Sequence, residues 1–237
     1  MNCLLLEPEE FDRASCRAQV VGRRRKHADE ILKSSPGDVL RVGVIGGQLG
    51  RAEIISLDAE SLDLRVELDR DPPPKRGLTL ILALPRPPVF RRLLSTIASL
   101  GVARLLVVGT SRTEKSFWQS HVVEPDRIRE RLLLGLEQAR DSILPSVEIH
   151  RYFEELANDV LPPLLARSRG LVAHPDAEMA CPHDVGEEIT LFVGPEGGLV
   201  EYEVERLHRL GFESVHLGER VLRVEPVIPL LVGRLFS

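Results

Sequence analysis

Aromatic residues are scarce in this chain of 237 residues, at 4%. Proteins that hold RNA bases on rows of stacked rings need more of them, so this mode of RNA binding is disfavoured. Cysteines are also few, because Cys3, Cys16 and Cys181 are scattered, odd in number and without zinc or redox spacing. No disulfide framework is predicted, and a reducing cytoplasm is the expected location.

Long apolar runs are missing as well. No run is long enough to span a bilayer, and the amino terminus lacks the positive start and apolar core of a signal peptide. His174, Cys181 and His183 lie near one another but have neither a tight spacing nor a fourth partner, so no metal site is predicted. The hydrophobic content of 43% is ordinary for a globular protein with an ample core.

Charge is distributed unevenly along the chain. The net charge of −5 argues against a nucleic-acid partner, yet residues 75–140 hold 12 Lys or Arg against 5 Asp or Glu. Residues 141–237 hold 8 Lys or Arg against 17 Asp or Glu. This uneven charge distribution is compatible with an RNA backbone that docks on one face, and the alternative is that the basic residues lie on a solvated helix face. The candidate RNA contacts are Arg23, Arg24, Arg25, Lys26, Arg112, Lys115 and Arg140.

A run of prolines at Asp71-Pro72-Pro73-Pro74-Lys75 indicates a domain boundary, because consecutive prolines form a stiff spacer. The predicted domains are residues 1–72 and 73–237. In the first, a helical stretch around His27 to Leu32 precedes short β-patterned pieces separated by turn signals. These pieces, at 39–44, 50–55 and 62–68, predict a small β-barrel.

After the prolines, apolar strands alternate with helices. This rhythm predicts an α/β domain with a mostly parallel sheet covered on both faces. Ligands of such sheets bind at the carboxyl ends of strands, where His174, Gly194 and Gly218 fall. The expected strands are 78–84, 105–108, 170–174, 189–193 and 214–217, and the expected helices lie around 90–100, 128–136, 156–165 and 201–207.

Two glycine-containing strand ends are the strongest functional signal. Gly194-Pro195-Glu196-Gly197-Gly198 lies between an apolar strand and a helix, and Leu217-Gly218 opens a second turn. A plain turn is the simpler interpretation. If the two ends lie side by side, their backbone atoms form one pocket. The spacing matches neither a dinucleotide fingerprint nor a phosphate loop, so a nucleoside with a cationic group fits better than a polyphosphate.

Several segments occur in the order typical of a known family. They are Ala83-Leu84-Pro85, Leu100-Gly101-Val102, Glu114-Lys115-Ser116, Glu137-Gln138-Ala139-Arg140, the Gly194–Gly198 stretch and Leu217-Gly218-Glu219-Arg220-Val221-Leu222-Arg223, with His27 and Gly37-Asp38 before them. Together they resemble the RsmE family, small-subunit ribosomal RNA uridine N3-methyltransferases of the SPOUT class. The resemblance covers essentially the whole chain, and its carboxyl-terminal pair of motifs is the most specific part.

The resemblance implies a fold, a cofactor and partners. It implies a PUA-like amino-terminal barrel that binds RNA, and a SPOUT-type parallel sheet with a carboxyl-terminal trefoil knot. It also implies a homodimer, S-adenosylmethionine as methyl donor, and small-subunit ribosomal RNA or the assembled subunit as substrate. The implied donor-binding residues are His174, Val193, Gly194, Pro195, Glu196, Gly197, Leu217, Gly218, Val221, Leu222 and Arg223.

The chemistry of uridine N3 selects three catalytic candidates. N3 must lose a weakly acidic proton, and the developing negative charge on the neighbouring carbonyls must be stabilised. Arg223 suits the second task, because a guanidinium stays charged and bonds two acceptors. Glu225 and Glu196 are candidates for a base or a charge partner of the sulfonium. For Glu196 the alternative is a cap of the following helix, and for His174 it is a structural role.

The chain departs from the family pattern at two places. Where the family usually continues Leu-Arg-Thr-Glu-Thr-Ala, this chain has Leu222-Arg223-Val224-Glu225-Pro226-Val227. Val224 lacks a hydroxyl and Pro226 lacks a backbone donor, so a weakened donor pocket is expected. Arg140 also follows Glu137 by three residues rather than four. Two alternative functions stay open: methylation of another RNA atom such as a ribose 2′-hydroxyl, and RNA binding without catalysis.

Overall fold

The computed structural model describes residues 2–31 and 33–236, so Leu32 at the end of the predicted first helix lies outside the described residues. By its internal contacts the chain forms two compact units. The amino-terminal unit comprises residues 1–74 and 133–144, and the carboxyl-terminal unit comprises residues 75–132 and 145–237.

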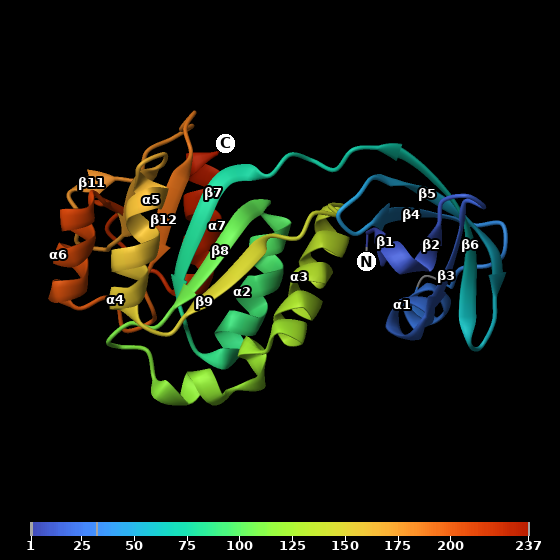
Figure 1. The fold of residues 1–237 in the computed structure, drawn as a ribbon, viewed down its shortest axis with the longest axis horizontal. Coiled ribbons are helices and arrows are strands. Elements are labelled where there is room, and N and C mark those ends of the chain that lie inside the picture. Colours follow the sequence, from blue (N-terminus) through green and yellow to red (C-terminus); the bar gives the residue numbers. More distant parts are fainter. Residues whose placement is uncertain (1, 32, 237) are drawn as a thin grey trace. The chain divides into compact units, whose positions relative to one another are not determined.

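The amino-terminal unit is built on a six-stranded sheet with the order β1-β4-β5-β6-β3-β2 (Figure 1). Its core is formed by inward-facing residues such as Val42, Ile54 and Leu64. Alternating burial along β5 and β6 reflects one covered and one exposed face, and in β6 it follows the alternation of apolar and polar residues at 62–68. The strands are β1 (Leu4–Leu6), β2 (Phe11–Asp12), β3 (Arg17–Val21), β4 (Val39–Val44), β5 (Leu49–Leu57) and β6 (Ser61–Arg70).

This sheet is open. The edge strands β1 and β2 each pair with one neighbour, β4 and β3 respectively, so the sheet is a half-barrel. A closed PUA-like barrel therefore stays a prediction. The helical segment of the unit begins earlier than expected, because α1 (Gly22–Lys26) already contains the basic run and a π-helical turn (His27–Ile31) continues it. A 3-10 turn covers Pro8–Glu10.

Residues 133–144, which include the end of α3 (Pro125–Ala139), complete the amino-terminal unit. The Asn2 amide donates to the Glu137 carbonyl at 3.2 Å, and the Gly46 amide donates to the Ser142 carbonyl at 2.8 Å. The Ser142 hydroxyl also donates to the Gly47 carbonyl. Arg23 forms an ion pair of 2.7 Å with Glu137, whose side chain is buried. These bonds join two segments that are far apart in the sequence.

The carboxyl-terminal unit contains a seven-stranded sheet with the order β11-β13-β10-β12-β7-β8-β9, and every adjacent pair is parallel. The predicted parallel sheet is thus confirmed. The strands are β7 (Arg76–Ala83), β8 (Val102–Val108), β9 (Ser146–His150), β10 (Arg169–Ala173), β11 (Met179–Ala180), β12 (Ile189–Val193) and β13 (Glu213–His216).

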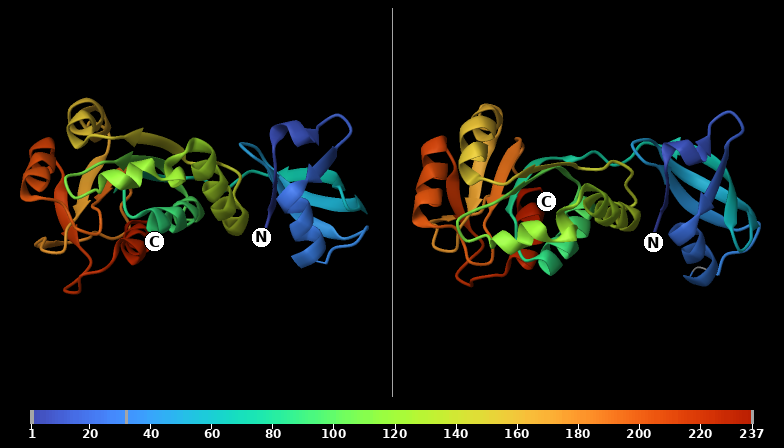
Figure 2. Two further views of the ribbon diagram at one scale, coloured as in Figure 1. Left: turned by 90° about the horizontal axis from the view of Figure 1, so that it is seen from below. Right: turned by 60° about the horizontal axis from the view of Figure 1, so that its bottom comes forward.

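Helices cover both faces of this sheet (Figures 1 and 2). Ile81, Leu106 and Phe192 pack on one face against the segment 153–165 and the helix that follows β12. On the opposite face lie α2 and α7, which contact each other. The helices are α2 (Pro87–Ser99), α3, α4 (Phe153–Glu155), α5 (Leu161–Leu165), α6 (Glu201–Leu210) and α7 (Val224–Leu235), with short 3-10 or π turns at Lys115–Gln119, His121–Val123 and Leu156–Val160.

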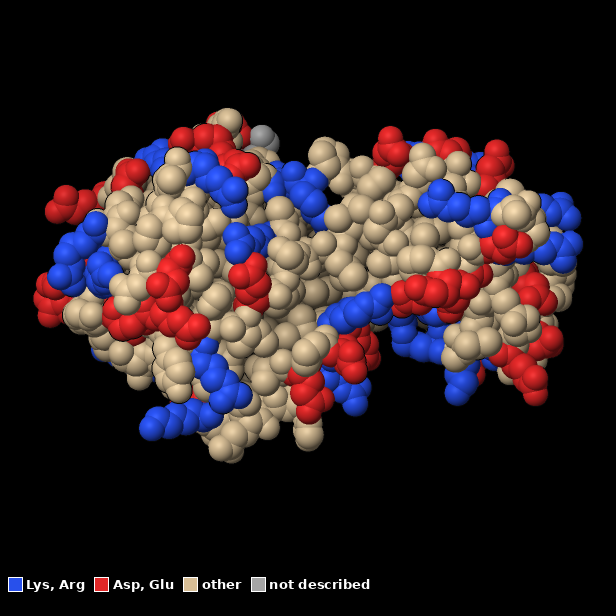
Figure 3. Space-filling view, viewed as in Figure 1, with Lys and Arg blue, Asp and Glu red and all other residues tan. Residues whose placement is uncertain are grey.

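None of the helices formed by residues 2–31 and 33–236 has the length and apolar character that a membrane crossing requires. Within the same ranges, no three His, Cys, Asp or Glu side chains form a group that could hold a metal ion. On the face drawn in Figure 3, blue and red patches alternate with uncharged surface. On this face, an anionic partner would therefore meet local clusters of basic residues rather than a broad positive surface.

Candidate functional site

A cavity of about 440 Å³ lies at the carboxyl ends of β10, β12 and β13. Ala173 and Val193, the last residues of β10 and β12, pair in register, and Ala173 also pairs with Val215, the residue before the end of β13. The three strands therefore end next to one another. The chain leaves each strand into a loop that lines the cavity. The size falls in the range typical of small-molecule sites.

The strands that carry the two glycine loops are not neighbours, as the sequence suggested they could be. Strand β10 lies between β12 and β13. Both loops nevertheless line the same cavity. The sequence could not reveal the intervening strand, because strand order in a parallel sheet depends on the crossovers.

The cavity brings together every predicted donor-binding residue except Arg223. The lining includes His174, the stretch Val193–Gly197, Leu217, Gly218, Val221 and Leu222. Arg223 is exposed and precedes the first residue of α7, between the lining residues Leu222 and Val224. That these residues bind a cofactor stays a prediction.

Backbone geometry at the glycines explains why they occur here. The Gly198 amide donates to the Pro195 carbonyl at 2.8 Å, and Gly198 has φ +73°. Gly218 has φ +116°, and its amide donates to Nδ1 of His216 at 2.9 Å. Side chains other than glycine are strained at such angles. Both tight turns belong to the cavity lining.

Neighbouring loops hold the Gly194–Gly198 stretch from two sides. A carboxylate oxygen of Glu196 accepts a hydrogen bond of 3.1 Å from the Arg86 amide, which lies just after β7. The Arg112 guanidinium, from the loop after β8, donates to the Gly197 carbonyl. Arg112, predicted to contact RNA, therefore lies in the cavity wall, where its side chain is bound to the glycine loop. Sequence reasoning missed this contact because it spans 85 positions.

Glu203 is the buried anchor of this arrangement, with 1% of its surface exposed. One carboxylate oxygen accepts from the Ser111 amide at 2.7 Å, and the other accepts from the Val200 amide at 3.0 Å. A carboxylate bonded by two backbone amides is well satisfied despite its burial. The residue that bonds the start of α6 is thus Glu203, and the suggested capping of this helix by Glu196 is wrong.

The contacts of His174 are compatible with both of its predicted roles, the structural one and the donor-binding one. Its amide donates to the Val215 carbonyl at 3.0 Å, and its ring Nδ1 accepts from the Asp176 amide at 3.3 Å. These bonds shape the turn after β10, and the residue also lines the cavity. Asp176 adds an exposed carboxylate to the lining that sequence reasoning missed. Its signal was its place after a strand end, two residues beyond His174.

The two acidic catalytic candidates, Glu225 and Glu196, occupy different positions. Glu225 does not line the cavity and forms an ion pair of 2.8 Å with Arg92. The hydrogen bond from Arg92 is the main reason that the pKa of Glu225 lies below its ordinary value, and the Arg223 charge adds to it. A lowered pKa makes this carboxylate a weaker base. Glu196, in contrast, is exposed and lines the cavity.

The departures from the family pattern lie in the first turn of α7. Val224 is buried and lines the cavity, whereas Pro226 is exposed and does not. Pro226 is the third residue of the helix, where a backbone amide has no intrahelical acceptor, so the ring removes no helical hydrogen bond. The Val227 amide donates to the Arg223 carbonyl at 3.3 Å. Any weakening of the cavity is therefore expected from Val224.

Some of the predicted RNA-contacting side chains outside the cavity already bond other protein groups, whereas others are exposed. Arg23 pairs with Glu137, and Arg24 makes two hydrogen bonds of 2.5 and 2.8 Å with Glu10. Arg25 is buried and bonds Asp29 and the Asp58 carbonyl. The remaining candidates Lys26, Lys115 and Arg140 are exposed.

Comparisons with known proteins agree with this geometry. The family described as "RNA methyltransferase domain" matches residues 72–234. The ribosomal RNA small subunit methyltransferase E of Treponema pallidum is 27% identical over 235 residues, which cover 95% of this chain and 86% of that protein. The ribosomal RNA small subunit methyltransferase E 1 of Borreliella burgdorferi is 21% identical over 225 residues, which cover 95% of this chain and 93% of that protein.

Two solved structures share the fold. The ribosomal RNA small subunit methyltransferase E of Neisseria gonorrhoeae, bound to S-adenosyl methionine, superposes with a TM-score of 0.75 at 20% identity over 97% of this chain and 95% of that one. A putative methyltransferase of Legionella pneumophila in complex with the cofactor SAM superposes with a TM-score of 0.78 at 19% identity, over 98% of this chain and 95% of that one. The family match covers most of the chain, including every cavity loop. The chain therefore belongs to the RNA methyltransferase domain family.

Proposed function

We propose that the protein is an S-adenosylmethionine-dependent methyltransferase that modifies N3 of a uridine in 16S, small-subunit, ribosomal RNA. The observation that carries the proposal is the cavity at the ends of β10, β12 and β13, lined by both glycine loops. Relatives named ribosomal RNA small subunit methyltransferase E match over more than nine-tenths of the chain, which supports the choice of substrate.

The cavity lining fits S-adenosylmethionine by its chemistry. Apolar side chains such as Val193, Leu199 and Leu217 suit the adenine ring, and exposed loop backbone can bond its edges. Asp176 and Glu196 offer carboxylates for ribose hydroxyls and for the cationic part of the molecule. No lysine belongs to the described lining; of its two arginines, Arg112 is bonded to the Gly197 carbonyl, and Arg220 is exposed in the turn after β13. This donor set favours a nucleoside with a positive charge over a polyphosphate.

The residues beside the cavity have distinct tasks in this reaction. When bound, S-adenosylmethionine supplies an electrophilic methyl group. Arg223 neutralises the negative charge that spreads to the uracil carbonyls as N3 loses its proton. Glu196 takes that proton or balances the sulfonium charge, since it lies at the cavity. Glu225, with its lowered pKa, acts as a charge partner of Arg223 rather than as the base.

The RNA substrate would be held by both parts of the chain. In this proposal residues 1–72 form a PUA-like RNA-binding domain and residues 73–237 form the SPOUT methyltransferase domain. Lys26, Lys115 and Arg140 are exposed and available to phosphates. Contacts by Arg23, Arg24 and Arg25 would first require their present ion pairs to open.

Three further features belong to the proposal. The segments that follow β12 and β13 form a trefoil knot, which the position of β12 between β10 and β7 supports. Two copies form a homodimer that covers the apolar side chains of Val221, 80% exposed, and Leu230, 51% exposed. The protein acts in the cytoplasm, where ribosomal subunits are assembled. Light scattering that gives the mass of one chain at micromolar concentration would contradict the dimer.

Methyl transfer to isolated small subunits and to deproteinised 16S RNA tests the activity. The RNA is digested after the reaction and its nucleosides are identified by mass spectrometry. We expect N3-methyluridine at one position, and we expect reverse transcription to stop there, because N3 lies on the base-pairing edge.

A Gly218→Val variant is the matched control, since strain at φ +116° distorts one cavity loop and none of the candidate RNA contacts is changed. This variant should bind RNA but transfer no methyl group. A 2′-O-methylated ribose would assign the second reaction considered above. Cofactor binding without methylated product on either RNA would instead favour a non-catalytic RNA-binding protein.

A further inference from the structure

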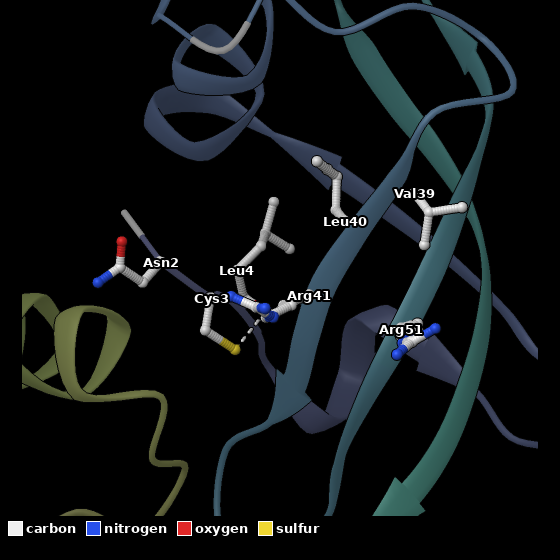
Figure 4. A pocket seen from close by; sticks show the side chains of 7 residues that line it. All are labelled: Asn2, Cys3, Leu4, Val39, Leu40, Arg41 and Arg51. Atoms are coloured by element: carbon white, nitrogen blue, oxygen red, sulfur yellow. Dashed lines mark hydrogen bonds between the residues drawn. The ribbon is translucent and has the colours of Figure 1, made fainter.

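Two adjoining cavities of the amino-terminal unit share the side chains of Arg41 and Arg51. One, of about 480 Å³, is also lined by Asn2, Cys3 and Val39 (Figure 4). The other, of about 340 Å³, is lined in addition by Arg70 and Arg140. The four arginines come from β4, β5, β6 and the residue after α3, and all four are exposed. We call them the arginine cluster.

The arginines of this cluster are free of carboxylate partners. None of the ion pairs found among residues 2–31 and 33–236 includes any of the four. One acidic residue, Asp69, lines the smaller cavity, and Glu67 lies opposite Arg51 in the register of β5 and β6. The cluster thus keeps an excess of positive charge. In this respect it differs from Arg23, Arg24 and Arg25, whose guanidinium groups are paired.

Two features of the arginine cluster lower the stability of the fold. Arg41 and Arg51 are direct register partners on adjacent antiparallel strands, where like charges repel. Arg17 and Arg65 also oppose each other, but Arg65 pairs with Glu53 at 3.2 Å, whereas neither Arg41 nor Arg51 has an ion-pair partner among the described residues. Arg140 has φ +57° in the turn that ends α3, a position that favours glycine. A residue held against its conformational preference is a pointer to function. Both costs are explained if the cluster binds an anion.

The buried thiol beside the cluster does not oppose an anion. Burial is the main cause that raises the pKa of Cys3 to about 11, and Glu137 raises it further, while the charges of Arg70, Arg140 and Arg41 lower it. The thiol is therefore neutral near pH 7. Arg41, Arg70 and Arg140, whose charges act on this sulfur, also line the same cavity.

We propose that the arginine cluster binds consecutive phosphates of a single-stranded RNA backbone, an inference that rests on the proposed RNA substrate. Four guanidinium groups spread over two cavities exceed what one small anion can engage, whereas an RNA strand presents a phosphate at every nucleotide. Val39, 62% exposed on the same strand as Arg41, gives a base or ribose an apolar contact. Mixed basic and apolar surface is typical of single-strand binding.

The test measures binding of the full-length protein to a fluorescent single-stranded RNA of about 16 nucleotides as the salt concentration is varied. The variant is Arg41→Gln/Arg51→Gln/Arg70→Gln. Each lost phosphate contact reduces the slope of log affinity against log salt by about 0.7, so the slope should fall by about 2 and the affinity by about 100-fold at about 0.1 M salt.

The matched control is Arg13→Gln/Arg17→Gln/Arg65→Gln, which removes the same charge from exposed positions of the same unit. Its salt slope should equal that of the wild-type protein. An unchanged slope in the cluster variant, or an equal fall in both, overturns the proposal. Melting temperatures of all variants ensure that folded protein is compared.

Arg140→Gly separates function from stability. Glycine relieves the backbone strain at φ +57°, so the melting temperature should rise while RNA affinity falls by about 5-fold, the loss of one phosphate contact. A rise in stability with unchanged RNA affinity removes Arg140 from the site. The methyl-transfer assay keeps the two proposals apart. If the wild-type protein methylates RNA and the triple variant keeps the wild-type salt slope, only the arginine-cluster proposal is refuted. If the triple variant loses salt slope but the wild-type protein forms no methylated product, only the proposed enzymatic function is refuted.

Discussion

The substitution Glu203→Gln tests whether the buried carboxylate holds the cofactor loops in place. Glu203 bonds the Ser111 amide on one side and the Val200 amide on the other, at 2.7 and 3.0 Å. Glutamine has the same shape but only one acceptor oxygen. Its amide nitrogen would face a backbone N–H, so one hydrogen bond is lost and the other loses its charge.

The magnitude follows from the burial of the group. A hydrogen bond to a charged group contributes about 1.5–3 kcal/mol, and the amide left without an acceptor adds to the loss. We therefore expect the free energy of unfolding to fall by about 2–4 kcal/mol, and the melting temperature by about 4–16 °C for a chain of this size. Since Ser111 adjoins Arg112, which bonds the Gly197 carbonyl, the loop after β12 should also lose part of its support.

Calorimetry and thermal unfolding measure both consequences. The dissociation constant of S-adenosylmethionine should rise by about 10-fold, equivalent to about 1.4 kcal/mol. Glu205→Gln is the control, because Glu205 lies on the same helix and is exposed, so its stability change should stay within about 0.5 kcal/mol. If the two variants melt and bind alike, Glu203 does not anchor the loops and the argument fails.

The remaining predictions concern single positions. Gly218→Ala should lower stability by about 1–2 kcal/mol through strain at φ +116° and weaken cofactor binding, whereas Gly211→Ala, at φ +102° away from the cavity, should lower stability alone. Val224→Thr should tighten cofactor binding in calorimetry, because it returns a hydroxyl to the cavity wall, while equal tightening by exposed Pro226→Thr would contradict this assignment. Burial lowers the pKa of His27 below 6.5, so the folded state disfavours its proton and stability is lost as the pH falls through the lowered pKa. His27→Gln should therefore reduce the fall in melting temperature between about pH 7 and pH 5, and identical pH profiles would exclude this role.

Much of the carboxyl-terminal fold is readable from the sequence. Strands such as Ile189–Val193 are buried on both faces and therefore appear as continuous apolar runs. Strand β9 was missed because it is an edge strand, half-buried and alternating in polarity. The order of the strands could not be predicted either, since placing β10 between β12 and β13 depends on crossovers with no local signal.

The site was predictable where local backbone chemistry determines it. Glycines at positive φ mark the two turns, and these turns do line one cavity. Contacts made across the fold have no such signal. Arg112 and Glu203 are ordinary charged residues in the sequence, and only the structure shows that they hold backbone of neighbouring loops. The free arginines of the amino-terminal unit were likewise indistinguishable from the paired ones before their partners were known.

The discontinuity of the amino-terminal unit has a consequence for its synthesis. The segment 133–144 supplies the Glu137 and Ser142 groups that bond Asn2, Arg23 and Gly46. A chain emerging from the ribosome therefore cannot complete this unit when the proline run has been translated. It must wait until residue 144 is exposed, by which time β7 and β8 are also available to fold. The two units consequently mature together rather than one after the other, and a fragment that ends at Pro74 should be an unstable folding intermediate.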